Sequence, residues 1–468
     1  MLVNSTIHRG LVELVPAEPG AVGMYVCGAT VQSEPHVGHG RYAVVFDMIR
    51  RYLVWKGYRV NYVRNITDID DKIIVAAASA GEDVAARAAR IAVIFSDSYR
   101  ALGVGDPDHE PKATEHIPEM LDLIGLLIKR GLAYPARNGD VYFAVRTLES
   151  YGKLSGRRPD ELLSGARIEV SEEKNDPLDF ALWKAAKPGE PSWDSPWGPG
   201  RPGWHIECSA MALRYLGTDF AIHGGGNDLI FPHHENEIAQ SEGATGETFA
   251  RFWLHNGMLN LGGEKMSKST GLLIDLGAAT KRFGGMSLRL FYLMAHYRSP
   301  LDYSEDLVMA ASMAYERLKR LLVRAPRVEG VDPDREILGR FVQAMDQDFA
   351  TPEALAHVFD AVAEANRLLD LGQQPVELVA AIHEIVSVLG IEVEPENLDD
   401  IAQVVSEVGE EFGVESGSPV EVLSRLIELR SRARAMRDFA RSDLIRDRLI
   451  EAGVVVEDTS DGARWVRR

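Results

Sequence analysis

The sequence predicts an α/β protein with a parallel sheet, an insertion within the sheet domain and a helical bundle after it. An apolar run at 23–30 reaches a glycine turn and is followed by helical spacing of apolar residues over 36–55. The same order, strand and then helix, recurs at 58–66 and 67–74. Repeated strand–helix units are typical of a parallel sheet. After about residue 305, apolar residues recur at helical spacing in one segment after another, which indicates the bundle.

Changes in composition along the chain predict where its segments begin and end. Residues 110–200 are rich in proline, glycine and charge, which indicates an insertion between two halves of the sheet domain. The segments that we expect are 1–110 and 201–304 for the two halves of the sheet domain, 111–200 for the insertion, 305–390 for the helical bundle, 391–424 for an acidic linker that is helix-poor at 391–400, and 425–468 for a basic tail.

Composition indicates a folded protein of several domains. The chain has 468 residues, of which 46% are hydrophobic and 26% charged, as in ordinary globular proteins. We find no signal peptide and no apolar run of the length that spans a bilayer, so we expect a cytoplasmic protein without a membrane segment. The two cysteines, Cys27 and Cys208, do not suggest a disulfide framework in such a protein.

Charge is distributed unevenly, although the net charge is −19. Residues 391–424 carry ten acidic and no basic side chains, whereas 425–468 carry eleven arginines and eight acidic side chains. A local excess of arginine can bind phosphates even in an acidic protein. The tail at 425–468 therefore offers guanidinium groups for phosphates and Trp465 for stacking on an unpaired base, although a solvated arginine-rich helix explains the same charges.

Two histidines lie between the first glycine turn and the first helix, in the tetrapeptide His36-Val37-Gly38-His39. The free N–H groups of a helix N-terminus favour anions, and Gly38 lets the backbone approach a nucleotide. These residues suit the phosphates of ATP, although two surface histidines at a turn are an equally good interpretation of the tetrapeptide alone.

A second motif, Glu264-Lys265-Met266-Ser267-Lys268-Ser269, follows a glycine pair. Two ammonium groups on a mobile loop can stabilise the charge that develops on a leaving pyrophosphate, so Lys265 and Lys268 join His36 and His39 as catalytic candidates. The two motifs together resemble the signatures of class I aminoacyl-tRNA synthetases, which implies that the sheet domain is Rossmann-like and catalytic.

A third set combines both cysteines with His233 and Glu237, which are four residues apart and so share one helix face. Two thiolates, an imidazole and a carboxylate satisfy zinc in number and type, and another borderline-soft ion fits the same ligands. Each side chain alone is more simply explained as a core residue. All four together predict a metal site held by Cys27, Cys208, His233 and Glu237.

The resemblance narrows to the cysteinyl-tRNA synthetases and covers nearly the whole chain, through segments such as MYVCGAT, NITDIDDKI, GWHIECSAM, FPHHENEIAQ, EKMSKS and MDQDFATPEAL. It implies one zinc ion per chain on the four residues named above, which takes the substrate thiolate as a further ligand. It also implies that the tail binds the anticodon. The remaining assignments are Gly28, Thr30, Gly38, Gly226, Asn227, Asp228 and Lys268 to ATP, and Thr67, Trp204, His223 and His234 to the substrate pocket, with core packing equally likely for Trp204.

The resemblance implies activation of L-cysteine by ATP and Mg²⁺ to an adenylate, followed by transfer to the 3′ end of tRNA(Cys) by a monomer. A cysteine:amino-sugar ligase of mycothiol synthesis is the nearest alternative, since it resembles the same motifs but lacks a tRNA-binding tail. A non-catalytic RNA-binding paralogue is a further alternative, which the intact histidine and lysine motifs disfavour.

Overall fold

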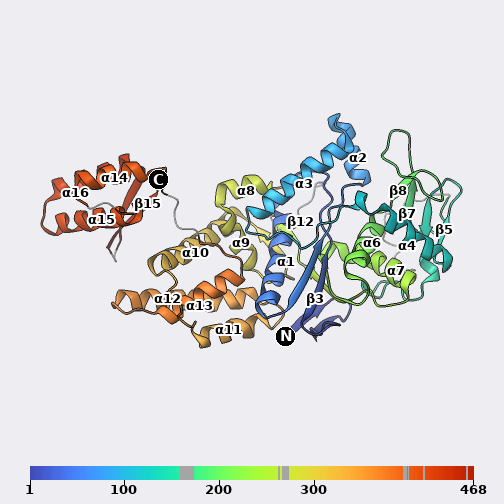
Figure 1. Cartoon of the computed structure of the whole chain (residues 1–468), viewed down its shortest axis with the longest axis horizontal. Coiled ribbons are helices and arrows are strands. Elements are labelled where there is room, and N and C mark those ends of the chain that lie inside the picture. The colour runs from blue at the N-terminus through green and yellow to red at the C-terminus, as the bar shows by residue number, and fades with distance from the viewer. Residues whose placement is uncertain are drawn as a thin grey trace. The chain divides into compact units, whose positions relative to one another are not determined.

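The computed structural model describes residues 1–158, 173–261, 264–265, 273–393, 398, 400–414, 417–459 and 462–467. The chain forms two compact units, Met1–Glu392 and Val393–Arg468, which are described separately below (Figure 1). None of the described helices combines the length and the apolar character needed to cross a bilayer.

A four-stranded parallel sheet lies at the centre of the first unit. Its strands are β3 (Ala21–Val26), β4 (Arg59–Arg64), β9 (Phe220–Gly226) and β10 (Ala250–Asn256), in the order β10-β9-β3-β4. After β3 the next strand, β4, lies on one side of β3, and β9 later lies on the other side of β3. The direction of winding therefore reverses between β3 and β9, and ligands of open parallel sheets bind beyond the carboxyl ends of the strands at such a point.

Helices cover both faces of this sheet. Because crossovers are right-handed, the two directions of winding place α1 (Val37–Trp55) on one face and α6 (Trp204–Leu216) on the other, with α7 (Glu235–Thr245) beside α6 (Figure 1). The boundaries of α1 agree with the helix expected at 36–55. Gly224 of β9 admits the Phe46 ring of α1, because a Cβ on this glycine would lie 2.4 Å from the ring.

The second helix begins later than the sequence indicates. A helix was expected from residue 67, but α2 starts at Asp71, after Asp70 caps it by accepting the Lys72 N–H at 2.8 Å. Thr67 instead forms a bridge with Thr30 in extended conformation. Capping and this loop pairing outweigh the helical spacing of the apolar residues, and they keep Thr67 at the edge of the sheet.

The insertion contains a sheet of its own, which the composition at 111–200 did not predict. Strands β5 (Ala133–Pro135), β6 (Val141–Phe143), β7 (Phe180–Ala185) and β8 (Gly200–Pro202) pair antiparallel in that order, next to α4 (Ile117–Lys129). Its buried Phe143 and Trp183 share one apolar cluster with Tyr25 and Trp253 of the parallel sheet. The strands are too short to show a period of two in the sequence.

Further elements complete the first unit. The bundle consists of α10 (Glu305–Arg324), α11 (Arg335–Met345), α12 (Thr351–Asp370) and α13 (Val376–Val388). Asp348 joins it to the sheet domain by accepting the Asn4 N–H and the Tyr297 hydroxyl, both at 2.7 Å. The other elements are β1 (Leu2–Ser5), β2 (Gly10–Glu13), α2 (Asp71–Ala80), α3 (Val84–Arg100), β11 (Leu259–Leu261), β12 (Glu264–Lys265), α8 (Leu276–Phe283), α9 (Gly285–Leu293) and β13 (Leu301–Tyr303).

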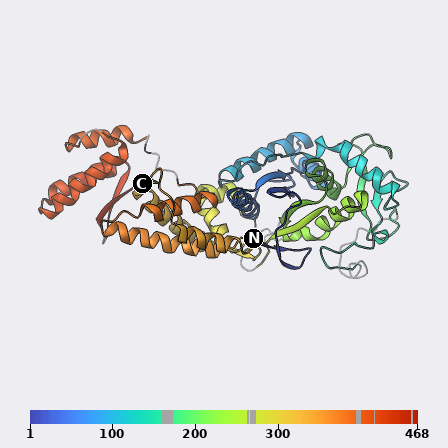
Figure 2. The ribbon, with the colours of Figure 1, turned by 60° about the horizontal axis from the view of Figure 1, so that its bottom comes forward.

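The second unit differs from the expected acidic linker 391–424 and basic tail 425–468. It consists of α14 (Ala402–Glu411), α15 (Pro419–Ala435), α16 (Phe439–Glu451) and a hairpin of β14 (Val454–Thr459) and β15 (Gly462–Arg467) (Figure 2). Helix α14 lies within the expected linker, because Val405 and Val408 are buried in a core with α15 and α16. Trp465 is partly buried against the same core, so less of its ring is open for stacking than expected.

Candidate active site and metal centre

The loops after β3 and β4 meet at the carboxyl edge of the sheet. A Cβ on Gly28 would lie 1.6 Å from the Asn65 carbonyl oxygen, so only glycine allows this approach. The Gly28 N–H donates to Asn65 Oδ1 at 2.8 Å, and Asn65 Nδ2 donates to Thr67 Oγ1 at 3.3 Å. Asn65 thus holds together the loops that carry the ATP candidates Gly28 and Thr30 and the substrate candidate Thr67.

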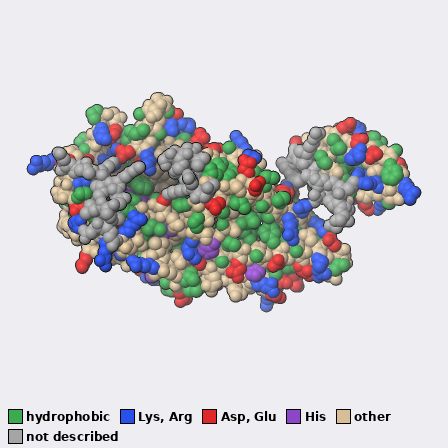
Figure 3. Space-filling view, turned by 180° about the vertical axis from the view of Figure 1, so that it is seen from behind, with side chains coloured by type: hydrophobic (Ala, Val, Ile, Leu, Met, Phe, Trp, Pro, Cys, Tyr) green, Lys and Arg blue, Asp and Glu red, His purple; other side chains and the backbone are tan. Residues whose placement is uncertain are grey.

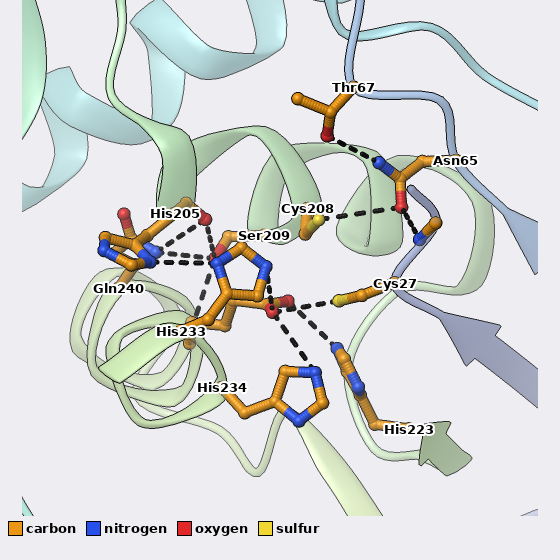
Figure 4. Close-up of polar contacts among 12 residues, drawn as sticks. Cys27, Asn65, Thr67, His205, Cys208, Ser209, His223, His233, His234 and Gln240 are labelled. Atoms are coloured by element: carbon orange, nitrogen blue, oxygen red, sulfur yellow. Dashed lines mark hydrogen bonds and ion pairs between the residues drawn. The ribbon is translucent and has the colours of Figure 1, made fainter. Parts of the chain in front are cut away.

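The four predicted metal ligands converge beside these loops (Figure 4). Cys27 follows β3, Cys208 lies on α6, His233 lies in the turn Ile230–His234, and Glu237 lies on α7. All four are buried, and their ligand atoms lie within 4.8 Å of one another. Glu237 Oε1 accepts the Cys27 thiol at 3.1 Å and lies 3.1 Å from His233 Nε2.

The donors and their spacing fit a zinc ion. Tetrahedral zinc with bonds of about 2.0–2.3 Å separates its ligand atoms by roughly 3.3–3.8 Å, so small shifts close the cluster on an ion. A second set, Cys27, His223, His234 and Glu237, meets the same spacing, and His223 Nε2 lies 2.9 Å from Glu237 Oε2. The two sets share Cys27 and Glu237, but only the first contains both thiols of the chain.

Burial controls the protonation of the cluster. It raises the pKa of the Cys27 and Cys208 thiols and lowers that of His233 to about 3. Burial would also raise the pKa of Glu237, but the neighbouring His223 and His233 outweigh it and lower that pKa. Without an ion the four ligands are therefore the Glu237 carboxylate, two neutral thiols and the neutral imidazole of His233. A metal ion must displace the thiol protons, which makes binding depend on pH.

Side chains around the cluster orient its histidines. Trp204 stacks on His233, with ring centroids 4.2 Å apart, and the Lys72 ammonium lies 5.6 Å from the Trp204 ring centre. Nδ1 of His233 lies 2.9 Å from Nδ1 of His205, so the two nitrogens can share one proton in a hydrogen bond. This bond orients the His233 ring with its other nitrogen, Nε2, facing Glu237. The Trp204 ring is half-buried, with one face on the predicted ligand His233 and the Lys72 ammonium nearby. Core packing alone requires neither contact.

The substrate candidates His223 and His234 lie behind the cluster. His223 stacks on Trp253 at 4.1 Å, and His234 Nδ1 lies 2.8 Å from His255 Nε2. The far nitrogen of His255 meets the Thr6 hydroxyl at 2.7 Å. Both histidines are fully buried.

His36 and His39 form the N-terminal cap of α1. His36 Nδ1 accepts the Gly38 N–H, and His39 Nδ1 accepts the His36 N–H, both at 3.1 Å. A neutral imidazole that accepts at Nδ1 carries its proton on Nε2. The cap therefore gives the N-terminus of α1 two N–H donors in addition to its backbone amides. A Cβ on Gly38 would lie 2.9 Å from the His36 ring, so a side chain here would disturb the cap.

Gly226 is the last residue of β9, and Asn227 and Asp228 follow it in a short 3-10 helix at the same edge of the sheet. Lys265 lies in β12, whose backbone pairs with Asn260 of β11, while Lys268 lies outside the described residues. The structure thus brings the cysteine, histidine and glycine motifs to one edge and describes only the start of the lysine motif.

Sequence reasoning missed Asn65, His205 and His255. Asn65 had a usable signal, since a polar residue directly after a parallel strand lies at the ligand-binding edge. His205 and His255 had none, because their roles depend on contacts with His233 and His234 across the fold.

Two family models match the chain. Residues 13–313 match "tRNA synthetases class I (C) catalytic domain", and residues 340–394 match "DALR domain". The first match spans the parallel sheet, the insertion and both cysteines. The second spans most of the helical bundle.

Full-length relatives are also found among curated proteins. The chain is 48% identical to the cysteine–tRNA ligases of Thioalkalivibrio sulfidiphilus and Methylococcus capsulatus, and 46% identical to that of Dehalococcoides mccartyi. Each alignment covers 99% of this chain and 99% of the relative.

Solved structures show the same fold at lower identity. Mycobacterium tuberculosis methionyl-tRNA synthetase in complex with methionyl-adenylate has a TM-score of 0.58 and 18% identity over 82% of this chain and 94% of that one. A putative arginyl-tRNA synthetase of Campylobacter jejuni has a TM-score of 0.51 and 13% identity over 80% and 93%. The expected α/β fold is confirmed, and the chain belongs to the cysteine–tRNA ligase family of class I aminoacyl-tRNA synthetases.

Proposed function

We propose that the chain activates L-cysteine with ATP to cysteinyl-adenylate and transfers the cysteine to the 3′ end of tRNA(Cys). The observation that carries this proposal is the buried convergence of Cys27, Cys208, His233 and Glu237 at the sheet edge where α1 begins. A thiol-binding cluster and an anion-binding helix N-terminus at one edge suit a substrate that joins cysteine to a phosphate.

The first step needs no protein nucleophile. The cysteine carboxylate attacks the α-phosphorus of Mg²⁺-ATP, an oxygen–phosphorus bond forms, and the bond to pyrophosphate breaks. The Nε2–H groups of His36 and His39 donate to the phosphates, and Lys265 and Lys268 stabilise the charge on pyrophosphate. In the second step a terminal ribose hydroxyl of the tRNA attacks the adenylate carbonyl and AMP leaves.

Zinc is the metal that the cluster fits best, one ion per chain. When bound, the ion supplies a soft acceptor for the substrate thiolate, which a serine hydroxyl does not match. Cys27, Cys208, His233 and Glu237 hold it, while Thr67 and Trp204 line the position of the amino acid. His223 and His234 support the ligands from behind.

The glycines at the sheet edge leave room for the nucleotide. Gly28, Thr30 and Gly38 lie where β3 leads into α1, and Gly226, Asn227 and Asp228 lie where β9 ends. Glycine at Gly28 is required by its close approach to the Asn65 backbone, and a side chain at Gly38 would meet the His36 ring at the start of α1. We assign the phosphates to the first group and the adenosine to the second.

The unit Val393–Arg468 is the proposed tRNA anticodon-binding unit. It carries eleven arginines against seventeen acidic residues, so its net charge is −6, and the visible face in Figure 3 mixes basic and acidic side chains. The arginines concentrate around the α15–α16 turn, where Arg432, Arg434, Arg437 and Arg441 are exposed. Met436 and Phe439 at this turn are 78% and 59% exposed, so Phe439 replaces Trp465 as the expected stacking residue.

The alternatives are less well supported. The chain matches tRNA ligases along 99% of their length, including this last unit, for which an amino-sugar ligase would have no use. We further propose that the enzyme acts as a cytoplasmic monomer. The test is ATP–pyrophosphate exchange with each of the twenty amino acids. Exchange with cysteine alone is expected, and exchange with none would favour the non-catalytic paralogue.

A further inference from the structure

The phenol of Tyr25 lies next to the thiols and has no assigned role. Tyr25 lies in β3 two residues before Cys27, so both side chains leave the same face of the sheet. It is fully buried, and within the described residues its hydroxyl has no hydrogen-bond partner. A buried hydroxyl without a partner destabilises the folded state, so a hydroxyl retained here requires an explanation.

The nearest polar surroundings of this hydroxyl are the metal-binding side chains. Burial first, and then Cys208, Cys27 and Glu237, raise the pKa of Tyr25, so these three side chains are its electrostatic neighbours. Burial raises the pKa of Cys208 as well, while its contact with Tyr25 acts in the opposite direction. Tyr25 and Cys208 lie in the same buried cluster, but among the described residues the hydroxyl forms no hydrogen bond with this sulfur.

We propose that Tyr25 is a positioning residue for the metal site, whose hydroxyl donates to the Cys208 sulfur once that sulfur is a metal-bound thiolate. The proposal rests on the zinc site proposed above. A neutral thiol is a weak acceptor, whereas hydrogen bonds to an ionised acceptor are roughly twice as strong as neutral ones. The bond therefore forms mainly in the metal-loaded protein and adds to metal affinity.

The same hydrogen bond affects the substrate. By drawing electron density from the Cys208 sulfur, it leaves more positive charge for the thiolate of cysteine. Loss of the hydroxyl should therefore weaken cysteine binding without affecting the nucleotide, which we assign to the N-terminus of α1 and the end of β9. This separates the proposal from a purely structural role for Tyr25.

Tyr25→Phe removes the hydroxyl and keeps the ring. The matched control is Tyr99→Phe, since Tyr99 is also buried with a hydroxyl that lacks a partner among the described residues, but it faces Arg64 and not the thiols. We expect Tyr25→Phe to weaken zinc binding about 10–100-fold in competition with a chelator, and Tyr99→Phe to leave it unchanged. The KM for cysteine should rise in Tyr25→Phe alone, at unchanged KM for ATP.

Cobalt provides a second measurement that does not depend on activity. The thiolate-to-cobalt absorption band of the Co²⁺-loaded protein should shift in Tyr25→Phe and not in Tyr99→Phe. Equal zinc affinity in Tyr25→Phe and the parent overturns the proposal, and so does a failure of metal-free Tyr25→Phe to fold. A parent protein without zinc affinity would instead remove the metal site itself.

Discussion

The metal cluster and the α15–α16 turn present their functional groups in opposite ways. Cys208 and Glu237 are buried and held by neighbours from four segments of the chain, whereas Arg437 and Phe439 are exposed at a single turn. A small thiol must be distinguished from a hydroxyl by a dry, preformed site, because only close coordination separates them. The tRNA that we propose binds at this turn offers many phosphates and bases, which suit an exposed turn with several arginines.

The largest expected effect comes from the buried region. Cys208→Ser removes one sulfur donor from the cluster, and we expect loss of bound zinc together with at least about a hundredfold loss of cysteine activation. Elemental analysis and ATP–pyrophosphate exchange measure the two effects. The neighbouring substitution Ser209→Ala is the control, since the Ser209 hydroxyl faces Gln240, and it should retain zinc. A Cys208→Ser protein with full zinc content and activity would leave the second set, with His223 and His234, as the metal site.

The next effect concerns the lysine loop. Lys268→Ala should slow adenylate formation about 10²–10³-fold with little change in cysteine binding, because its charge acts on pyrophosphate. Pre-steady-state adenylate formation and equilibrium cysteine binding separate the two. Lys281→Ala, an exposed lysine of α8, should change neither. Normal exchange in Lys268→Ala would remove this residue from the catalytic set.

The exposed region should affect only the second step. Because the second unit begins at Val393, truncation after Glu392 removes it as a whole. We expect cysteine-dependent exchange to be preserved and charging of tRNA(Cys) to fall by orders of magnitude. The residual tRNA binding should be less sensitive to salt, since fewer phosphates are contacted. Full charging by the truncated protein would show that this unit does not bind the tRNA productively.

The smallest effect is the pH dependence of stability. Burial lowers the pKa of His255 to about 3, against about 6.5 in an unfolded chain. Below pH 6.5 the unfolded state therefore binds a proton that the folded state does not bind. The free energy of unfolding decreases as the pH is lowered from about 6.5 to about 3. The loss from this one histidine is about 2 kcal/mol between pH 7 and pH 5.

Urea denaturation of the metal-free protein at both pH values measures this loss. In His255→Gln the pH dependence should be smaller by that amount, whereas His8→Gln at an exposed position should not change it. An unchanged pH dependence in His255→Gln would mean that the pKa of His255 is the same in the folded and the unfolded protein.

The sequence predicted the parts of the site that depend on rare residue types. Only two cysteines occur, and both lie beside other motifs, so Cys27 and Cys208 pointed to a metal before any geometry was known. The helix at 36–55 was predictable because its apolar spacing and its cap are both local.

Features that depend on distant contacts were not predictable. The acidic charge of 391–424 suggested a linker, but Val405 and Val408 give α14 an apolar face that only α15 and α16 can bury. Likewise, the charge pattern suggested that Trp465 is available to RNA. It could not show that the hairpin of β14 and β15 packs this side chain against the core. His255 reaches the site only through His234.

The central claim is that the buried cluster selects cysteine through a bound metal ion. It is tested most directly by ATP–pyrophosphate exchange with cysteine and with serine, on zinc-loaded protein, on protein stripped by a chelator and on stripped protein reloaded with zinc. We predict exchange with cysteine that is lost on stripping and restored by zinc, and a preference over serine of about 10⁴-fold. Equal exchange with cysteine in the stripped and loaded protein would contradict the account.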